Sequence, residues 1–461
     1  MDIIKRKRGE NRAIRTPRGL AADILNRIED KNAFAEPLLD ACLSGERLPV
    51  SQDRGFITEL VYGTLRMQGH LDWIIGQFHR SKSTPLETGV RNILRTAIYQ
   101  IIYMDRVPAF AAVNEAVNLA RKDHPARASL VNAMLRNFLR RRDCLPYPDP
   151  AKEPALYISI FHSHPLWLVK RWISEFGSEE TRALCEANNR TPPLTVRVNT
   201  LKAARQALIA SLHREGTEAT PTPFSPDGLT VEKFGAPLKS LHVFQNGLIR
   251  IQDEASQLIS RLAAPRPGED VLDLCSGSGG KTTHLAAIME NRGRILAVDK
   301  SPAKLDSLKD AAIRLGLTII EGLAADAANL PDKNLYNRFD LVLADVPCTG
   351  LGTLRRNPEI KWRIRSEDVR QAADLQGKIL KNAASCLKIG GRLVYSTCSV
   401  MPEENENVIA AFLAGHSNFT TTALTSDPAV RSLLAPDGFF RTYPHRHNMD
   451  GFFGAMLTRT A

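Results

Sequence analysis

Residues 271–282 read VLDLCSGSGGKT, an apolar run that ends in a carboxylate and leads into a glycine-rich turn. A short apolar run bounded by glycine is typical of a buried strand, and a helical pattern follows Lys281. Glycine suits such a turn because it lets the backbone approach a ligand and adopt angles that a Cβ forbids. The stretch therefore predicts a strand, a ligand-binding turn and a helix in succession.

Four further apolar runs repeat this arrangement toward the C-terminus and alternate with helical stretches. They are RILAVDKS (294–301), LTIIEGLAAD (317–326), FDLVLADVPC (339–348) and RLVYSTCSV (392–400). The alternation is the pattern of a parallel sheet with crossover helices, in which ligands bind at the carboxyl ends of the strands. We therefore expect a Rossmann-like α/β domain over residues 263–461.

The rest of the chain divides by its apolar spacing and its prolines. Residues 19–142 show apolar side chains at three- and four-residue spacing and predict an all-α bundle. Residues 143–155 begin with DCLPYPDPAKEP, which has four prolines in twelve residues and reads as a linker. Residues 156–262 mix helical and strand-like stretches and predict a small α+β domain. Residues 1–18 form a basic N-terminal tail.

Length and composition indicate a multidomain globular protein. The chain has 461 residues, 43% of them hydrophobic and 24% charged. No apolar run approaches the ~18 residues that a membrane span needs, and no apolar stretch follows the basic N-terminus. We expect a cytoplasmic, monomeric protein.

The net charge of +11 is concentrated in the first third of the chain. Residues 1–150 contain 24 Lys and Arg against 17 Asp and Glu. Such an excess favours a polyanionic partner, although a solvated surface that keeps the protein soluble gives the same count.

Residues at the ends of three predicted strands together predict a nucleoside-binding site. Gly277 lies in the turn, and Asp299 ends the next strand 22 residues later, where a carboxylate can accept from two ribose hydroxyls. Asp326 ends the third strand and can accept from an adenine amino group. NAD and S-adenosylmethionine both carry adenosine, so these residues leave the two open, and each aspartate alone is equally explained as a helix N-cap.

Two of the seven cysteines end apolar strands. Cys348 and Cys398 are each followed by hydroxyl and turn residues, so both are expected to face one cleft. The cysteines are scattered without a CxxC pair, which predicts reduced thiols rather than a disulfide framework or a metal site. Cys275 is expected to pack against the cofactor. The remaining four are interpreted as small apolar residues: Cys42, Cys144, Cys185 and Cys386. Two thiols at one cleft favour covalent catalysis.

The stretch LVYSTCSVMPEEN (393–405) resembles the thiol-bearing motif of the RNA cytosine-5 methyltransferases. Asp345-Val-Pro-Cys348-Thr-Gly resembles their Asp-x-Pro-Cys motif, and RRNPEIKWR, RVNTLK and IQDEAS extend the similarity over about residues 155–461. The helical first third resembles the NusB-like RNA-binding domain, and residues 156–262 resemble a ferredoxin- or RRM-like RNA-binding domain. The combination is similar to the ribosomal RNA enzymes of the RsmB type.

The resemblance implies methyl transfer from S-adenosyl-L-methionine to C5 of cytosine 967 in 16S ribosomal RNA. C5 of cytosine is a weak nucleophile, so a thiolate must first add to C6. By resemblance Cys398 is this nucleophile, Cys348 assists release of the product, and Asp345 hydrogen-bonds N3 and the exocyclic amine. A helix opening at Pro402-Glu403 is expected to stabilise the thiolate. The target base must be flipped or unpaired.

The resemblance also gives a set of cofactor-binding residues, without a metal. The set is Cys275, Ser276, Gly277, Ser278, Gly279, Gly280, Lys281, Asp299, Asp326 and Asp345. The family turn usually reads Cys-Ala-Ala-Pro-Gly-Gly-Lys, so Ser278 replaces a proline that stiffens the loop. Lys281 either contacts cofactor or substrate or is a solvated residue at the start of the helix.

Three other functions stay open. The first is the same chemistry on another RNA such as transfer RNA. The second is a non-catalytic NusB-like RNA-binding or antitermination factor. The third is an NAD oxidoreductase, which leaves the two strand-end thiols without a task.

Overall fold

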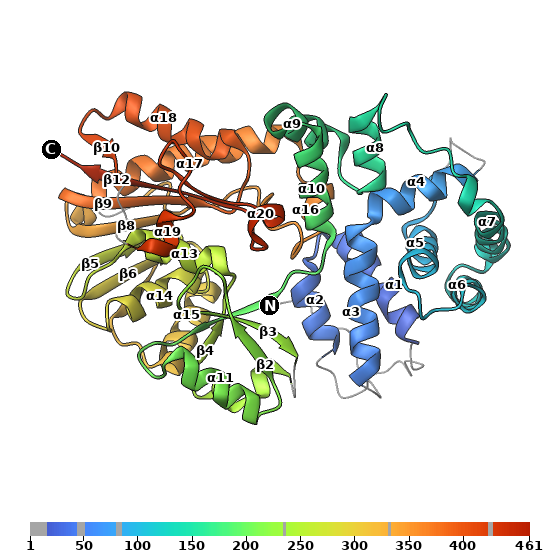
Figure 1. The fold of residues 1–461 in the computed structure, drawn as a ribbon, viewed down its shortest axis with the longest axis horizontal. Helices are drawn as coiled ribbons and strands as arrows, with labels where there is room; N and C mark the ends of the chain where they lie inside the picture. Colours follow the sequence, from blue (N-terminus) through green and yellow to red (C-terminus); the bar gives the residue numbers. More distant parts are fainter. Residues whose placement is uncertain (1–15, 44–50, 80–84, 234–236, 331–332, 423–426) are drawn as a thin grey trace. The chain divides into compact units, whose positions relative to one another are not determined.

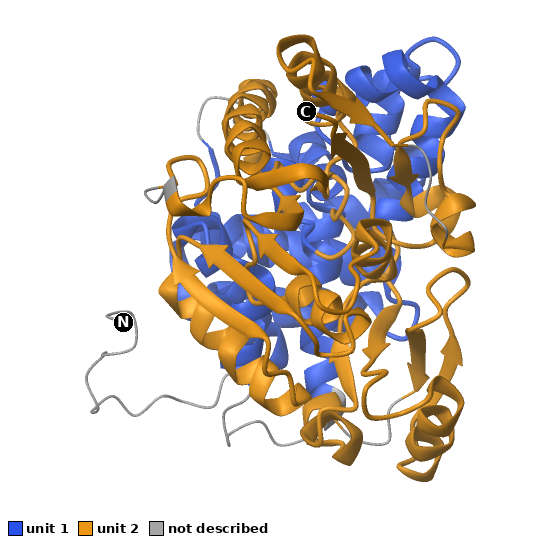
Figure 2. Cartoon of the chain, turned by 90° about the vertical axis from the view of Figure 1, so that its left-hand side faces the viewer, with its two compact units in different colours: residues 1–189, 357–362 blue, residues 190–356, 363–461 orange. Residues whose placement is uncertain are grey.

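The computed structural model describes residues 16–43, 51–79, 85–233, 237–330, 333–422 and 427–461. The chain forms two compact units (Figure 2). Unit 1 contains residues 1–189 and 357–362, and unit 2 contains residues 190–356 and 363–461. Most of the predicted basic tail lies outside the described residues. None of the described helices is long and apolar enough to cross a membrane.

Unit 1 is helical in its described part (Figure 1). Its α-helices are α1 (Pro17–Lys31), α2 (Ala35–Leu43), α3 (Ser51–Arg66), α4 (Gln68–Phe78), α5 (Thr88–Tyr103), α6 (Ala109–Asp123), α7 (Ala128–Arg141), α8 (Pro154–Phe161), α9 (Leu166–Phe176) and α10 (Ser178–Asn189). Two 3₁₀ turns, η1 (Pro125–Arg127) and η2 (Arg142–Cys144), flank α7. Helix α1 shows why the boundaries fall where they do: Thr16 Oγ1 accepts from Gly19 N at 3.2 Å, and Asn32 ends the helix with φ 51°.

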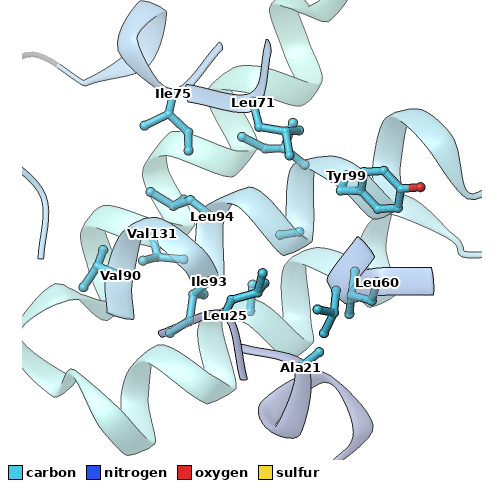
Figure 3. Packing of buried hydrophobic residues seen from close by; sticks show 14 of the residues in the cluster. Ala21, Leu25, Leu60, Leu71, Ile75, Val90, Ile93, Leu94, Tyr99 and Val131 are labelled. Atoms are coloured by element: carbon cyan, nitrogen blue, oxygen red, sulfur yellow. The ribbon is translucent and has the colours of Figure 1, made fainter. Parts of the chain in front are cut away.

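The core of unit 1 comes from apolar residues at helical spacing. In α5 the buried set is Val90, Ile93, Leu94, Ala97 and Ile98. Figure 3 shows side chains of this cluster converging on α5, among them Leu25 of α1 and Leu71 of α4. The predicted helical bundle is therefore present, and its periodicity reflects one shared apolar interior.

The proline-rich segment after α7 and the helices that follow it belong to unit 1. The Tyr147 hydroxyl and His70 Nε2 form a hydrogen bond at 2.7 Å. The Tyr147 ring stacks on Trp73 at a centroid distance of 4.6 Å. Helices α8 to α10, which the sequence groups with the small α+β domain, also lie in unit 1. Buried Trp172 and Leu184 give α9 and α10 apolar faces of their own, and periodicity cannot tell which core such faces join.

A hexapeptide from the second half of the chain completes unit 1. Residues 357–362 include a fully buried lysine, Lys361, whose Nζ donates to three oxygens. These are Arg66 O at 3.1 Å, Ser163 O at 3.2 Å and Asn189 Oδ1 at 2.6 Å. Burial lowers the pKa of Lys361 to about 7.

Two neighbours of Lys361 hold the hexapeptide further. Trp362 Nε1 donates to Leu65 O at 3.4 Å, and a Cβ at Gly69 would lie 2.3 Å from the Trp362 ring. Glu359 Oε1 accepts from Ala35 N at 2.9 Å. The glycine is thus required by close packing of the tryptophan.

Unit 2 contains a small antiparallel sheet in the order β2-β3-β1-β4. Its strands are β1 (Leu194–Val198), β2 (Glu218–Pro221), β3 (Gly228–Lys233) and β4 (Ile249–Ile251), with η3 (Leu238–Ser240) and the helices α11 (Arg205–Arg214) and α12 (His242–Gln245). Val196, Leu229 and Ile249 bury one face of the sheet with Leu208 and Leu212 of α11. The strand-like runs expected here are present, together with β2, which the sequence did not reveal.

The larger sheet of unit 2 has, within the described residues, eight strands. They are β5 (Asp270–Asp273), β6 (Arg294–Asp299), β7 (Ile320–Ala324), β8 (Phe339–Asp345), β9 (Leu387–Thr397), β10 (Phe419–Thr421), β11 (Phe440–Thr442) and β12 (Phe452–Arg459). The five predicted strands pair in parallel in the order β9-β8-β5-β6-β7. Strand β12 pairs antiparallel with β9, β10 and β11, so the sheet is mixed at this edge rather than wholly parallel.

Helices cover both faces of this sheet (Figure 1). One face carries α17 (Ser366–Cys386) and α18 (Glu406–Gly415), and the other carries α13 (Glu254–Ala263), α14 (Gly280–Ile288) and α15 (Pro302–Leu315). Shorter elements lie in the connecting loops: η4 (Lys333–Leu335), α16 (Ile360–Arg363), η5 (Pro402–Glu404), α19 (Pro428–Arg431) and α20 (Pro444–His447). Because the central strands are parallel, their carboxyl ends meet at one edge.

Candidate active site

The glycine-rich turn joins β5 to α14 with the backbone conformation that its glycines permit. Gly277 and Gly279 have φ of 56° and 82°, and a Cβ at Gly279 would lie 2.0 Å from Leu308 Cδ1. Gly277 N donates to Asp299 Oδ2 at 3.0 Å, which ties the turn to the end of β6. The turn needs glycine for both its angles and its packing.

The predicted nucleoside carboxylates also serve their own loops. Asp299 is buried and its Oδ1 accepts from Ser301 N at 2.8 Å, while exposed Asp326 accepts from Ala328 N at 2.9 Å. Both residues stand at adjacent strand ends and accept from the amide two residues on, as in an Asx turn. The helix N-cap interpretation is wrong for both, because Ser301 is the N-cap of α15 and Asp326 is followed by a turn. Each carboxylate keeps further acceptor capacity.

Two buried polar atoms under the turn have no hydrogen-bond partner among the described residues. They are Asp273 Oδ1 and Ser276 Oγ. The other oxygen of Asp273, Oδ2, accepts from Thr282 Oγ1 at 2.7 Å, and burial raises the pKa of Asp273 to about 7. Asp273 was noted in the sequence only as a strand-end carboxylate, and its unsatisfied oxygen makes it a candidate ligand-binding residue.

Cys275 lies half-buried against the core beneath the turn. Burial raises the pKa of its thiol, and nearby carboxylates add to the effect. A thiol in this state packs as a small apolar group, and its expected contact with the cofactor stays a prediction.

The structure brings the two strand-end thiols together. Cys348 Sγ and Cys398 Sγ lie 3.2 Å apart, each side chain half-buried. Parallel pairing of β8 with β9 sets Asp345 beside Ser396, so the two loops leave the sheet side by side. The contact with Cys398, together with burial, raises the pKa of the Cys348 thiol well above its ordinary value.

Three loops close around these thiols. Gly352 N donates to Cys398 O at 2.9 Å, and Gly451 N donates to Gly352 O at 2.8 Å. A Cβ at Gly352 would lie 2.0 Å from Gly451 O, so only glycine allows the loops to approach this closely.

A carboxylate, rather than a helix terminus, lies behind the thiol loops. Pro402–Glu404 forms a single 3₁₀ turn and α18 begins only at Glu406, so the helix opening expected at Pro402-Glu403 is wrong. The chain tightens there because the Glu404 side chain is drawn fully into the interior. The effect of a helix dipole on Cys398 stays a prediction, and the helix concerned would be α18.

Glu404 accepts four hydrogen bonds from residues that flank the thiols. Oε1 accepts from Thr349 N at 2.8 Å and from Gln376 Nε2 at 3.0 Å. Oε2 accepts from Thr349 Oγ1 and from Ser399 Oγ, each at 2.5 Å. One buried carboxylate thus fixes both the loop after Cys348 and the loop after Cys398. Sequence reasoning quoted this glutamate only as part of a helix opening.

Lys281 links the turn to the thiol side of the site. Its Nζ lies 2.7 Å from Asp345 Oδ2 and 4.8 Å from the centroid of the Phe452 ring. Ser396 Oγ donates to Asp345 Oδ1 at 2.7 Å. Lys281 is buried, so the alternative of a solvated helix-start lysine is wrong; the ion pair draws the side chain inward.

An arginine pair connects two of the motifs quoted from the sequence. Arg355 Nε donates to Asp450 Oδ1 at 2.8 Å, and Arg356 contacts Asp253 Oδ2 and Asp450 Oδ2 at 2.7 Å each. Asp253 also caps α13 by accepting from Ala255 N at 2.9 Å. RRNPEIKWR and IQDEAS therefore meet in a buried ion network beneath the site.

The remaining cysteines differ in burial. Cys185 and Cys386 are buried, as expected, and Cys42 is half-buried. Cys144 is exposed, so its interpretation as a buried apolar residue is wrong. It ends η2 in the proline-rich segment, where no helix face carries it inward.

Comparison with known proteins identifies the family. Residues 260–458 match the family described as 16S rRNA methyltransferase RsmB/F. A probable ribosomal RNA small subunit methyltransferase B from Bacillus subtilis is 36% identical over 95% of this chain and 97% of its own length. The chain belongs to the RsmB/F family of 16S rRNA methyltransferases. The resemblance read from its motifs is thereby confirmed, and so is the expected enzyme class, an RNA methyltransferase.

Further similarities of this RsmB/F family member cover the other domains. Residues 15–140 match the NusB family, and residues 164–236 match the ferredoxin-like domain of RsmF/B-like methyltransferases. Ribosomal RNA small subunit methyltransferase B from Escherichia coli is 33% identical over 96% of this chain and 99% of its own length. These matches confirm the predicted fold classes.

Solved structures resemble the RsmB/F chain as well. One crystal structure with 30% identity covers 96% of this chain and 99% of its own with a TM-score of 0.81. A methyltransferase homologue from Pyrococcus horikoshii, also 30% identical, covers 68% of this chain and 100% of its own with a TM-score of 0.58.

Proposed function

We propose that this protein transfers the methyl group of S-adenosyl-L-methionine to C5 of a cytosine, cytosine 967, in 16S ribosomal RNA through a covalent Cys398–C6 adduct. The observation that carries the proposal is the 3.2 Å contact between Cys348 Sγ and Cys398 Sγ at the strand ends. Two thiols this close can act on the same pyrimidine ring. Family membership supports the substrate class.

The turn fits the cofactor in its chemistry. Asp273 Oδ1 and Ser276 Oγ are buried without a partner among the described residues, as groups that await a polar ligand do. Asp299 and Asp326 would accept from the nucleoside, and Gly277 and the exposed backbone at Ser278 leave room for it. When bound, the cofactor supplies an electrophilic methyl group on a sulfonium.

Each thiol has its own task in the proposal. The Cys398 thiolate adds to C6, and the electron pair moves toward C5, which then takes the methyl group. Water accepts the C5 proton, the electron pair returns to the ring, and the Cys398 sulfur leaves as a thiolate. Cys348, whose pKa is raised by its contact with Cys398, stays a thiol and donates a hydrogen bond to the leaving thiolate. Asp345, held by Lys281 and Ser396, hydrogen-bonds the pyrimidine at N3 and the exocyclic amine.

The RNA would reach this site with its target base unpaired or flipped. We propose a monomer that acts in the cytoplasm on 16S ribosomal RNA of the small subunit or its precursor. The match of residues 15–140 to the NusB family favours this over transfer RNA, because it adds an RNA-binding domain to the methyltransferase. The basic excess of the first third would contribute salt-dependent phosphate contacts.

Substitution of each thiol tests the assignment of roles. Cys348→Ala should accumulate a covalent protein–RNA adduct, because Cys398 still attacks while release is slow. Cys398→Ala should neither methylate nor trap RNA. Denaturing gel electrophoresis with labelled RNA measures the adduct, and labelled methyl transfer measures turnover.

Cys144→Ala is the matched control, since Cys144 is an exposed cysteine outside the site. It should methylate like the wild type and trap no RNA. Adduct formation by Cys398→Ala, with none by Cys348→Ala, would reverse the two roles.

The RNA target is tested with labelled S-adenosylmethionine and total RNA from ribosomes that lack the modification. Label should enter 16S ribosomal RNA, and mapping should place it at one cytosine. Label confined to transfer RNA would overturn the substrate assignment and leave the chemistry intact.

A further inference from the structure

Two arginines of the small sheet donate hydrogen bonds to the glycine-rich turn. Arg250 of β4 donates from Nη2 to Ser278 O at 2.6 Å. Arg197 of β1 donates from Nη1 to Gly280 O at 2.8 Å. Two carbonyls of the turn, two residues apart, are thus held by guanidinium groups from strands that are distant in sequence from the turn.

The contacts of the Arg197 side chain fix its position. It is fully buried, contacts the Gln252 side chain and donates from Nη2 to Thr283 Oγ1 at 3.1 Å in the first turn of α14. Neither Arg197 nor Arg250 has an ion pair with a carboxylate within the described residues. Burial of a guanidinium without a carboxylate is costly, so the oxygens of the turn act as its main partners.

A third arginine lies close to Arg197 and Arg250. Arg314 of α15 donates from Nη1 to Phe244 O and Ile249 O at 2.6 and 3.0 Å. Burial, with the charge of Arg250 second, lowers the pKa of Arg197 to about 9. Burial, with the charge of Arg314 second, lowers the pKa of Arg250 to about 10. Burial is the larger cause of both shifts, so the oxygens that the guanidinium groups contact are what stabilise their charge.

The turn needs such support because of its own residues. Gly277 and Gly279 both have positive φ and little intrinsic stiffness, and Ser278 between them is exposed. A serine also lacks the fixed φ that a proline would give at this position. Hydrogen bonds from a charged donor to a carbonyl are among the stronger ones in proteins, so the guanidinium contacts can limit the motion of the turn.

We propose that Arg250 and Arg197 are positioning residues for the cofactor: the small sheet holds the glycine turn in its binding conformation through the carbonyls of Ser278 and Gly280. The inference deepens the proposed function and rests on it, because it takes S-adenosylmethionine as the ligand of the turn. It also gives the ferredoxin-like domain a task other than contact with RNA.

Arg250→Ala in the full-length protein tests the proposal, because Arg250 is only half-buried and its loss leaves the core intact. Affinity for S-adenosylmethionine, measured by calorimetry without RNA, should fall about tenfold. Arg250→Lys should recover part of the loss, since an ammonium can still donate to Ser278 O. Hydrogen exchange of the Gly277–Gly280 amides in the cofactor-free protein should become faster in Arg250→Ala.

Arg205→Ala is the matched control. Arg205 also lies in the small domain and donates to a backbone carbonyl, Ser225 O at 3.1 Å, but it does not contact the turn. This variant should bind the cofactor like the wild type. RNA affinity, measured by filter binding, should be unchanged in both alanine variants.

The outcomes separate the two proposals. If the wild type does not bind S-adenosylmethionine, the proposed function fails. If the wild type binds and Arg250→Ala binds equally well, the positioning role is overturned and the proposed function stands. Equal losses of cofactor affinity, RNA affinity and thermal stability in Arg250→Ala would show a general structural role and would also overturn it.

Discussion

The two halves of the candidate active site are contacted by side chains of opposite charge. In the glycine-rich turn, the guanidinium groups of Arg197 and Arg250 donate to the carbonyls of Gly280 and Ser278. The thiol loops present an amide and hydroxyls inward and are held by the carboxylate of Glu404. The turn is also contacted by Asp299, which accepts from Gly277 N, and three of the four donors to Glu404 are side chains.

The comparison shows how irregular loops at strand ends are made rigid. The turn offers the Ser278 and Gly280 carbonyls to charged donors, whereas the thiol loops offer N–H and O–H groups to a charged acceptor. Lys281 and Asp345 join the halves through their 2.7 Å contact. Substitutions can therefore be chosen that weaken one half and spare the other.

Glu404→Gln should have the largest effect. It replaces a fully buried carboxylate that accepts four hydrogen bonds with an amide that must turn N–H groups toward those donors. Breaking such a buried charged network costs about 3 to 5 kcal/mol, so single-turnover methyl transfer should fall about 10³-fold. Affinity for S-adenosylmethionine should stay within about twofold, because the cofactor turn is untouched. Equal losses of transfer and cofactor binding would mean that the halves are not independent.

Asp273→Asn should have the next largest effect, on the cofactor half. Because burial raises the pKa of Asp273 to about 7, the folded protein keeps a proton that the unfolded chain releases near pH 4. Its contribution to the free energy of unfolding is complete below about pH 4 and is lost as the pH rises through about 7. Between about pH 5 and pH 8 the cofactor-free wild type should lose on the order of 2 to 3 kcal/mol that the isosteric variant keeps. Denaturant unfolding at both pH values measures this, and parallel pH profiles would contradict it.

Thr349→Val should have the smallest effect. It removes one of the four donors to Glu404, the 2.5 Å bond from Oγ1, and leaves the 2.8 Å bond from the backbone amide. A loss of about 1 kcal/mol should slow methyl transfer about fivefold. Thr349→Ser retains the hydroxyl and should stay within about twofold of the wild type. A serine variant as slow as the valine variant would point to packing rather than hydrogen bonding.

Much of the fold could be predicted because its signals are local. Apolar runs and glycine turns located the parallel strands, and three- and four-residue spacing located the helices of unit 1. The facing thiols could be predicted too, since both follow parallel strands and such strands end at one edge. The antiparallel edge around β12 was missed, because FFGAMLTR gives a strand-like run without showing its direction.

The missed features depend on contacts between residues far apart in the chain. Glu404 looked like an ordinary residue of a helix start, and only its burial against Thr349 and Gln376 reveals its task. Arg197 was quoted within RVNTLK, but neither it nor Arg250 could be assigned a contact, because their partners include backbone carbonyls, which every residue has. The boundary of the small α+β domain stays a prediction: α8 to α10 lie in unit 1, but the ferredoxin-like match begins at residue 164 and includes α9 and α10.

The hexapeptide that ends unit 1 has a consequence for how the protein is made. Lys361 can reach the oxygens of Arg66, Ser163 and Asn189 only after much of unit 2 has left the ribosome. A nascent or truncated chain that stops at Asn189 would leave a hole where Lys361 and Trp362 belong, lined by carbonyls with no donor. Unit 1 therefore includes six residues that follow much of unit 2 in the chain. A gene fragment that ends at Asn189 would encode an incomplete unit 1.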